Sequence, residues 1–105
     1  MKDFIQDMDK KSRAKTWRYV ELLEKQGPNL LRPYTDHVRG KIRELRIRVR
    51  PGNVRIFYFF FMEKNTILLH AFKKKTRELP KREIEHAERN MQDFISRYKQ
   101  GEFEL

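Results

Sequence analysis

Residues 45–73 read LRIRVRPGNVRIFYFFFMEKNTILLHAFK, and this stretch decides the fold. Over residues 45–50 three aliphatic residues alternate with three arginines, which predicts a strand with one apolar and one cationic face. Residues 54–62 are apolar on both faces apart from Arg55, a pattern typical of a central strand. Pro51-Gly52 between them suits a two-residue type II turn, and residues 67–73 predict a third strand.

The residues before this stretch predict two helices. Lys2–Met8 has apolar residues on one helical face, and Asp9 is a suitable N-cap for a second helix over Lys10–Gln26. Gly27-Pro28 then ends that helix. We expect the two helices to form a hairpin with a shared apolar face.

The remaining segments complete the predicted fold. Residues 29–41 contain a proline and a glycine, so we expect them to be irregular. Pro80 suits the first turn of a last helix, whose apolar residues form one stripe over residues 84–98. The chain is therefore predicted to be one α+β domain over residues 1–105, with about three antiparallel strands, an N-terminal helical hairpin and a C-terminal helix.

The net positive charge is concentrated in two short segments. Arg39–Arg55 and Lys73–Arg82 together contain 13 Lys/Arg and two acidic residues, whereas the other 78 residues contain 12 Lys/Arg and 13 acidic residues. The apolar strands lie between these segments in the sequence. A focused cation cluster around a buried sheet predicts a binding site for a polyanion, of which nucleic acid is the commonest.

Composition also excludes several classes of protein. The absence of cysteine excludes a disulfide framework and a zinc ribbon. Charged residues throughout Met1–Lys11 do not resemble a signal peptide, and no apolar run is long enough to span a membrane. We therefore expect a soluble, cytoplasmic protein with no membrane partner.

The arginines are expected to form one face. With a two-residue turn at Pro51-Gly52, Arg48 lies opposite Arg55 and Arg46 lies opposite Phe57. Paired arginines repel unless an anion lies between them, and an unpaired charge within an apolar strand is costly. This placement favours an anion site.

Simpler interpretations remain open at this point. Alternating arginines on an edge strand can be a solvated face that prevents aggregation. Arg55 can instead form a buried salt bridge, to Glu44 or to a carboxylate on a helix. The run from Lys73 to Arg77 can be a solvated loop rather than a phosphate-binding strand end.

The sequence has no standard catalytic or metal-binding motif. It lacks a cysteine nucleophile, a Ser/His/Asp arrangement, a glycine-rich phosphate loop and an HExxH motif, and no carboxylate cluster suggests a metal site. We interpret His70 as structural, and His37 and His86 have no partner at a ligand or triad spacing. The phenylalanines of residues 57–61 could stack on bases, but at strand spacing they are more often core.

Three segments carry a resemblance to a known family. They are GKIRELRIRVRPGNVRIFYFF (residues 40–60), ILLHAFKKKTRELPKREIEHA (residues 67–87) and KDFIQDMDKKSRAKTWRYVELLEKQGP (residues 2–28). Together they closely resemble the RelE/HigB-type toxins of type II toxin–antitoxin systems, and most of all the phage-related HigB branch. The resemblance covers nearly the whole chain, and the ordered combination of motifs carries it.

The resemblance implies a fold, an activity and a set of site residues. It implies a small α+β fold with helices on one face of an antiparallel sheet, an mRNA-cleaving activity on the ribosome, and a cognate antitoxin. The family's cationic positions match Arg46, Arg48, Arg55 and Lys74. Family members usually begin with a β-strand, so a chain that opens on a helix is expected to lack that edge strand.

The sequence thus predicts a metal-independent mRNA endoribonuclease without a cofactor, whose partners are a helix-turn-helix antitoxin, mRNA and the ribosome. The substrate's 2′-hydroxyl would attack the adjacent phosphate, held by Arg48 and Arg55, with Lys74 as base or leaving-group acid. The residues expected to contact the RNA or ribosome backbone are Arg46, Lys73, Lys75 and Arg77. The rival hypotheses are a non-catalytic nucleic-acid-binding or regulatory module and a basic domain that only binds an acidic protein.

Overall fold

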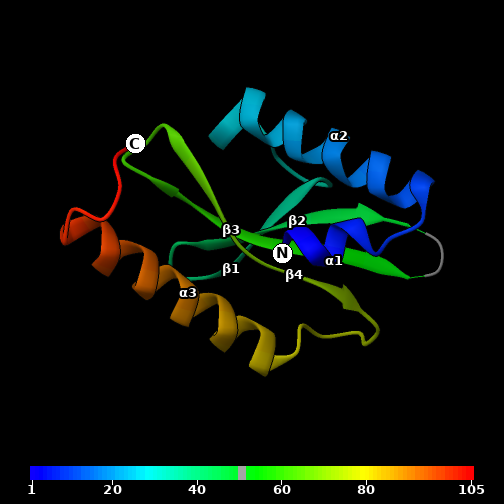
Figure 1. The fold of residues 1–105 in the computed structure, drawn as a ribbon. Helices are drawn as coiled ribbons and strands as arrows, with labels where there is room; N and C mark the ends of the chain where they lie inside the picture. Colours follow the sequence, from blue (N-terminus) through cyan, green and yellow to red (C-terminus); the bar gives the residue numbers. More distant parts are fainter. Residues whose placement is uncertain (50–51) are drawn as a thin grey trace.

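The computed structural model describes residues 1–49 and 52–105. In chain order the elements are α1 (Lys2–Gln6), α2 (Lys10–Gln26), the 3-10 turn η1 (Gly27–Asn29), β1 (Thr35–Arg39), β2 (Ile42–Arg48), β3 (Asn53–Phe61), β4 (Asn65–Lys74) and α3 (Lys81–Lys99). The predicted α+β class is confirmed, and each predicted helix is present (Figure 1). Neither of the two long helices in the described ranges is apolar enough over a sufficient length to cross a membrane.

The sheet has four antiparallel strands in the order β1-β2-β3-β4, not about three. The additional strand, β1, lies within residues 29–41, which we had expected to be irregular. Its five residues TDHVR carry little apolar signal, and only Thr35 is fully buried. In the described sheet β1 pairs with the edge of β2, so β1 and β4 are the outer strands.

The register between the central strands also differs from the prediction. Arg46 pairs with Arg55, and Arg48 pairs with Asn53, so the connection is longer than a two-residue turn. Within it the Val49 N–H donates to the Gly52 carbonyl oxygen at 3.3 Å. Arg50 and Pro51 lie outside the described residues. Because the shift is two residues, each arginine keeps its predicted face.

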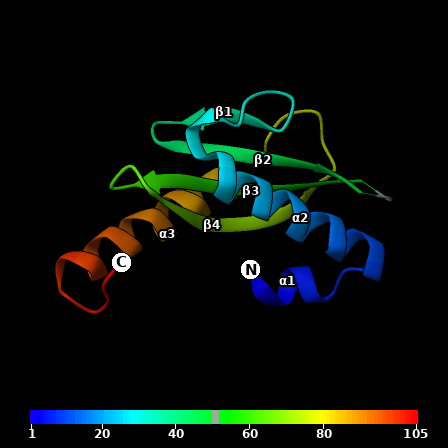
Figure 2. The same ribbon diagram turned by 90° about the horizontal axis from the view of Figure 1, so that it is seen from above.

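Helices cover both faces of the sheet, which corrects the expectation of helices on one face. In Figure 1 the sheet runs between α2 above and α3 below, and Figure 2 shows α2 crossing in front of it. One core cluster joins α2 to the sheet through residues such as Val20, Leu23 and Ile56. The second joins α3 to the opposite face through Phe57, Phe59 and residues of the predicted stripe, including Ala87.

The ends of α2 follow the sequence signals closely. The Asp9 carboxylate accepts a hydrogen bond from the Ser12 N–H at 3.4 Å, which satisfies a free backbone donor of the first turn. Gly27 ends the helix with a positive φ of 51°, a conformation that suits glycine. Helix α1 packs back on α2 and buries Ile5 completely. These signals fix the position of α2 beside the sheet.

A candidate nucleic-acid cleft

A cleft of about 560 Å³ opens at the end of the sheet that carries the β2–β3 connection. Four of its lining residues are cationic side chains from three neighbouring strands. The described residues that line it are Tyr19, Pro33, Tyr34, Arg46, Ile47, Arg48, Asn53, Arg55 and Lys74. The cleft therefore gathers side chains from α2, from the segment before β1, and from β2, β3 and β4.

The cleft is open because β1 is shorter than β2. The pairing of β1 with β2 ends at Thr35 and Leu45, and one further bond joins the Arg46 N–H to the Tyr34 carbonyl oxygen at 2.8 Å. Beyond this point the chain turns away from β2 toward Pro33. The last residues of β2 are therefore not paired on that side within the described sheet, and the cleft lies around them.

A buried ion pair lies beneath the cleft. Arg55 Nε is 2.8 Å from Glu44 Oε1, and both side chains are only 7% exposed. Within the described part of the chain, Arg55 Nε makes no hydrogen bond of standard geometry, so its contact with Glu44 is an ion pair. Arg55 Nη1 donates to the Val54 carbonyl oxygen at 3.4 Å. This is the salt bridge that the sequence left open as an alternative for Arg55.

Desolvation dominates the titration of this pair. Burial raises the pKa of Glu44, and the attraction of Arg55 and Arg46 offsets only part of that rise. Burial also lowers the pKa of Arg55, with Glu44 acting in the opposite direction. Breaking such a pair leaves an uncompensated buried charge, so each partner depends on the other.

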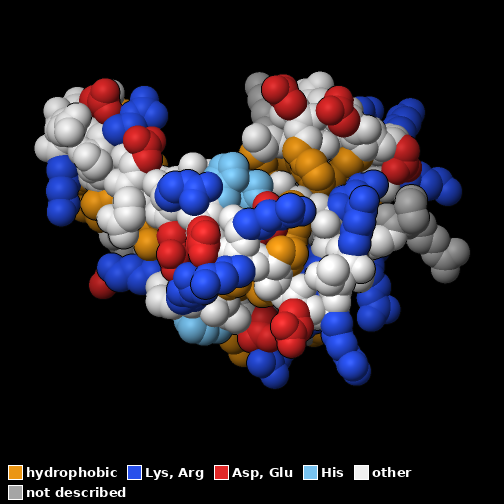
Figure 3. Space-filling model, turned by 90° about the horizontal axis from the view of Figure 1, so that it is seen from below, with side chains coloured by type: hydrophobic (Ala, Val, Ile, Leu, Met, Phe, Trp, Pro, Cys, Tyr) orange, Lys and Arg blue, Asp and Glu red, His pale blue; other side chains and the backbone are white. Residues whose placement is uncertain are grey.

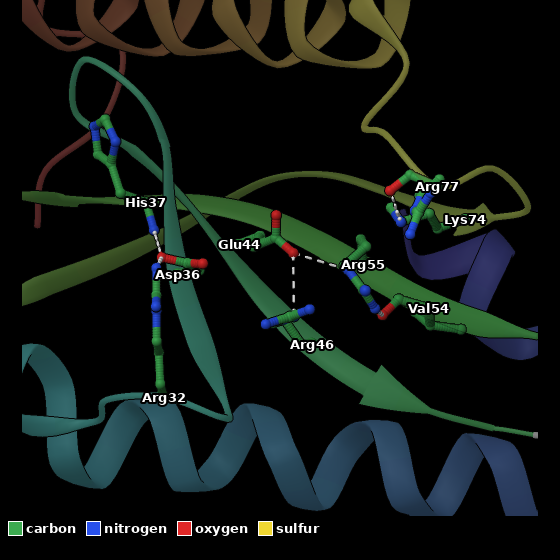
Figure 4. A network of polar contacts seen from close by, with 9 residues as sticks. All are labelled: Arg32, Asp36, His37, Glu44, Arg46, Val54, Arg55, Lys74 and Arg77. Atoms are coloured by element: carbon green, nitrogen blue, oxygen red, sulfur yellow. Dashed lines mark hydrogen bonds and ion pairs between the residues drawn. The ribbon is translucent and has the colours of Figure 1, made fainter.

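The other cations of the cleft are more accessible than Arg55. Arg46 and Arg48 are exposed, and Arg46 Nε lies 3.6 Å from Glu44 Oε1. The Lys74 ammonium donates to the Arg77 carbonyl oxygen at 2.7 Å, which holds it at the cleft's edge. Figure 4 shows Arg46 and Arg55 converging on Glu44, with Lys74 and Arg77 beyond Arg55. Four cations against one carboxylate leave a formal local charge of +3.

The structure brings together some of the predicted site residues and separates others. Arg46, Arg48, Arg55 and Lys74 line one cleft. Lys73 pairs with Val54 and points to the face opposite Lys74, because strand side chains alternate. Lys75 and Arg77 follow β4 as exposed side chains outside the cleft lining. Figure 3 shows Lys and Arg side chains over both halves of the face seen from below, with acidic side chains among them.

The phenylalanines of β3 have a core role. Phe57 and Phe59 are buried, and Phe61 packs edge-to-face on Phe94 and Tyr98 of α3. None of the three lines the cleft in the described part of the chain. The core interpretation is therefore confirmed for these three rings.

The histidines of β4 and α3 form a small cluster. His70 Nε2 lies 3.0 Å from Glu83 Oε1, in agreement with its predicted structural role. The His86 ring stacks on that of His70 with centroids 4.1 Å apart, a contact that the spacing along the chain does not predict. Burial and the neighbouring His70 lower the pKa of His86. Among the described residues, no group of three His, Asp or Glu side chains is placed to hold a metal ion.

Tyr19, Tyr34 and Asn53 are cleft residues that sequence reasoning missed. Tyr19 comes from α2 and Tyr34 from the segment before β1, and their ring centroids lie 5.8 Å apart. No local pattern links these positions, because only the packing of α2 beside β2 brings them to the cleft. Asn53 lies opposite Arg48 only in the observed register, because the predicted two-residue turn would have placed it two residues further along.

Residues 3–92 match the family described as Phage derived protein Gp49-like (DUF891). The chain belongs to the Gp49-like family. This family is associated with the toxins of toxin–antitoxin systems, which agrees with the class of the predicted resemblance. A comparison with curated proteins finds no match.

The buried ion pair predicts an unequal effect of two glutamate substitutions. Glu44→Ala should lower the free energy of unfolding by about 3–5 kcal/mol, because it leaves Arg55 buried without a counter-charge. Glu88→Ala removes an exposed carboxylate that lies 3.0 Å from Arg39, and should cost less than about 1 kcal/mol. Urea unfolding followed by circular dichroism measures both. Equal losses would contradict the role given to Glu44.

Proposed function

We propose that this Gp49-like protein is the toxin of a type II toxin–antitoxin system of the RelE/HigB kind. Its activity would be cleavage of mRNA on the translating ribosome in the cytoplasm. The observation that carries the proposal is the convergence of Arg46, Arg48, Arg55 and Lys74 in one cleft. A cationic concave surface concentrates a polyanion, and RNA supplies a phosphate at every nucleotide. The association of the family with toxins supports this choice over other polyanions.

The proposed reaction uses a nucleophile from the substrate. The RNA 2′-hydroxyl attacks the adjacent phosphorus, so a 2′-O–P bond forms while the bond from phosphorus to the 5′-oxygen breaks. The hydroxyl proton passes to a base, and the leaving 5′-oxygen takes up a proton. The products are a 2′,3′-cyclic phosphate and a 5′-hydroxyl end. No protein hydroxyl or thiol has to be activated, which suits a chain without cysteine.

The cleft residues have different proposed roles. Arg48 and Arg46 are exposed and would contact the non-bridging phosphate oxygens, which gain charge in the transition state. Arg55 would act from the floor of the cleft, since its side chain is only 7% exposed. Lys74 would exchange a proton with the 2′-hydroxyl or the leaving oxygen. Its remaining N–H bonds are available because an ammonium group has three donors.

The cations outside the cleft would serve contacts with other parts of the complex. Lys73, Lys75 and Arg77 are exposed around the end of β4, and we assign them to the RNA or ribosome backbone. The proposed antitoxin is a helix-turn-helix protein that presents acidic side chains to the cationic face. Because such an encounter is electrostatically steered, its association rate should fall as salt rises.

A non-catalytic nucleic-acid-binding module is the second candidate. It is favoured by the composition of the cleft, whose described lining includes no His, Asp or Glu that could serve as a base. The two candidates share the same binding surface and differ only in turnover. Cleavage of mRNA by the purified protein with ribosomes present separates them.

Arg48 offers the cleanest test of the cleft. The side chain is exposed, so Arg48→Ala should leave stability unchanged but lower the rate of mRNA cleavage on the order of 10²-fold, because a contact to the transition state is lost. Lys41→Ala is the matched control, since it removes an exposed charge at the other end of β2. Rates are measured on ribosomes with a defined message. A full rate for Arg48→Ala would remove Arg48 from the site.

The chemistry itself is tested with the substrate. A message with one 2′-deoxy nucleotide at the cleavage position should resist cleavage, because it lacks the nucleophile. The all-ribose message should yield an upstream fragment that ends in a 2′,3′-cyclic phosphate, which mass spectrometry identifies. Cleavage of the deoxy-substituted message at an undiminished rate would rule out this mechanism in favour of attack by water.

A further inference from the structure

Helix α2 presents a stripe of two lysines and a tyrosine beside the cleft. Lys11, Lys15 and Tyr19 are spaced four residues apart, so they lie on one side of the helix. Lys15 Nζ lies 5.8 Å from the centroid of the Tyr19 ring, which links the cationic and aromatic parts of the stripe. None of these three residues belongs to a site predicted from the sequence.

The stripe connects the cleft to a second hollow. This hollow has a volume of about 710 Å³ and is lined by Lys11, Lys15, Arg48 and Asn53, among others. Arg48 and Asn53 also line the first cleft, so the two hollows adjoin along α2. Asp9 is the acidic residue in the described lining, and its carboxylate already accepts the Ser12 N–H. Three cations therefore face one engaged carboxylate.

The cleft and the second hollow together form a groove along α2, and its aromatic end is in the cleft. Tyr34 provides a ring there that is available for stacking. Tyr34 is 38% exposed, and its ring meets that of Tyr19 at an interplanar angle of 63°. An edge-to-face pair of this kind holds the rings in place while leaving apolar ring surface toward the cleft. Single-stranded nucleic acids bind where a cationic groove follows the backbone and aromatic rings stack on bases.

We infer that this groove holds the single strand of RNA next to the phosphate in the cleft. Lys11 and Lys15 contact its backbone phosphates, and Tyr34, supported by Tyr19, stacks on one of its bases. This inference rests on the proposed function, because it identifies the path of the same substrate. It assigns to α2 a role in positioning the RNA, distinct from the cations of β2, β3 and β4 that would surround the reacting phosphate.

The test measures the binding of a short, fluorescein-labelled single-stranded RNA with 2′-O-methyl groups, which cannot be cleaved by the proposed route. Fluorescence anisotropy gives Kd over a range of salt concentrations. The Lys11→Ala/Lys15→Ala variant should bind more weakly and reduce the slope of log K against log salt by about 1.4, since two phosphate contacts are lost. Lys25→Ala/Lys64→Ala removes two exposed charges outside both hollows and should leave the slope unchanged.

The tyrosine is tested by a pair of variants of similar size. Tyr34→Leu should raise Kd on the order of tenfold without changing the salt slope, whereas Tyr34→Phe should bind like the wild type because it keeps the ring. Thermal unfolding verifies that each variant is folded. Equal slopes for the two double-lysine variants, or equal Kd values for the two Tyr34 variants, would overturn the inference. Failure of the wild type to cleave mRNA on ribosomes would instead overturn the proposed function.

Discussion

The buried ion pair between Glu44 and Arg55 is the constraint on which the site depends. The two side chains come from neighbouring strands and share one face, but they are not directly opposite, since Glu44 pairs with Phe57 and Arg55 with Arg46. They meet diagonally, a distance that long side chains can span. A two-residue slip to the register of a two-residue turn would place Glu44 opposite Phe59 and Arg48 opposite Arg55, which leaves Arg55 buried without its counter-charge. The pair therefore disfavours that register, although it keeps the same faces.

The pairing of β2 with β3 determines which side chains lie at the end of the sheet that the helices leave uncovered. Helix α3 covers the phenylalanine end of one face, and α2 covers the opposite face. The end of β2 is unpaired on one side within the described sheet, because its pairing with β1 ends at Thr35. Arg46, Arg48 and Arg55 lie there beside Lys74. Glu44 neutralises one of these charges and holds Arg55 in place. The arginines of the candidate cleft thus all come from paired strands, and one of them is held by a buried counter-charge.

Much of this arrangement could be predicted because its signals are local. The alternation of apolar residues and arginines in β2, the Asp9 cap and the apolar stripe of α3 are each readable within a few residues. Arg48 and Arg55 were correctly placed on one face although the predicted register was wrong. The error was two residues, and a shift of two residues leaves each side chain on the same face of its strand. Strand β1 was missed because its five residues carry little apolar signal. Its place in the sheet comes from pairing with β2, which no local pattern reports.

The site was harder to predict where it depends on packing between distant segments. Tyr19 and Tyr34 come together only because α2 lies beside the end of β2. Lys73 and Lys74 are adjacent in the sequence but face opposite sides of the sheet, and a cluster of charges along the chain does not reveal this difference until the strand is placed. A salt bridge from Arg55 to Glu44 was one of the alternatives that the sequence allowed. Its geometry depends on the pairing of β2 with β3, which was predicted incorrectly because the turn was taken to be two residues long.

The most direct test of the account is a crystal structure of the protein with a 2′-O-methyl single-stranded RNA. The account predicts a phosphate group within hydrogen-bond distance of the Arg46 or Arg48 guanidinium, with Lys74 at its far side and the Glu44–Arg55 contact intact beneath it. The strand would leave this phosphate along α2. An RNA bound elsewhere on the protein, with no phosphate in the cleft, would contradict the central claim.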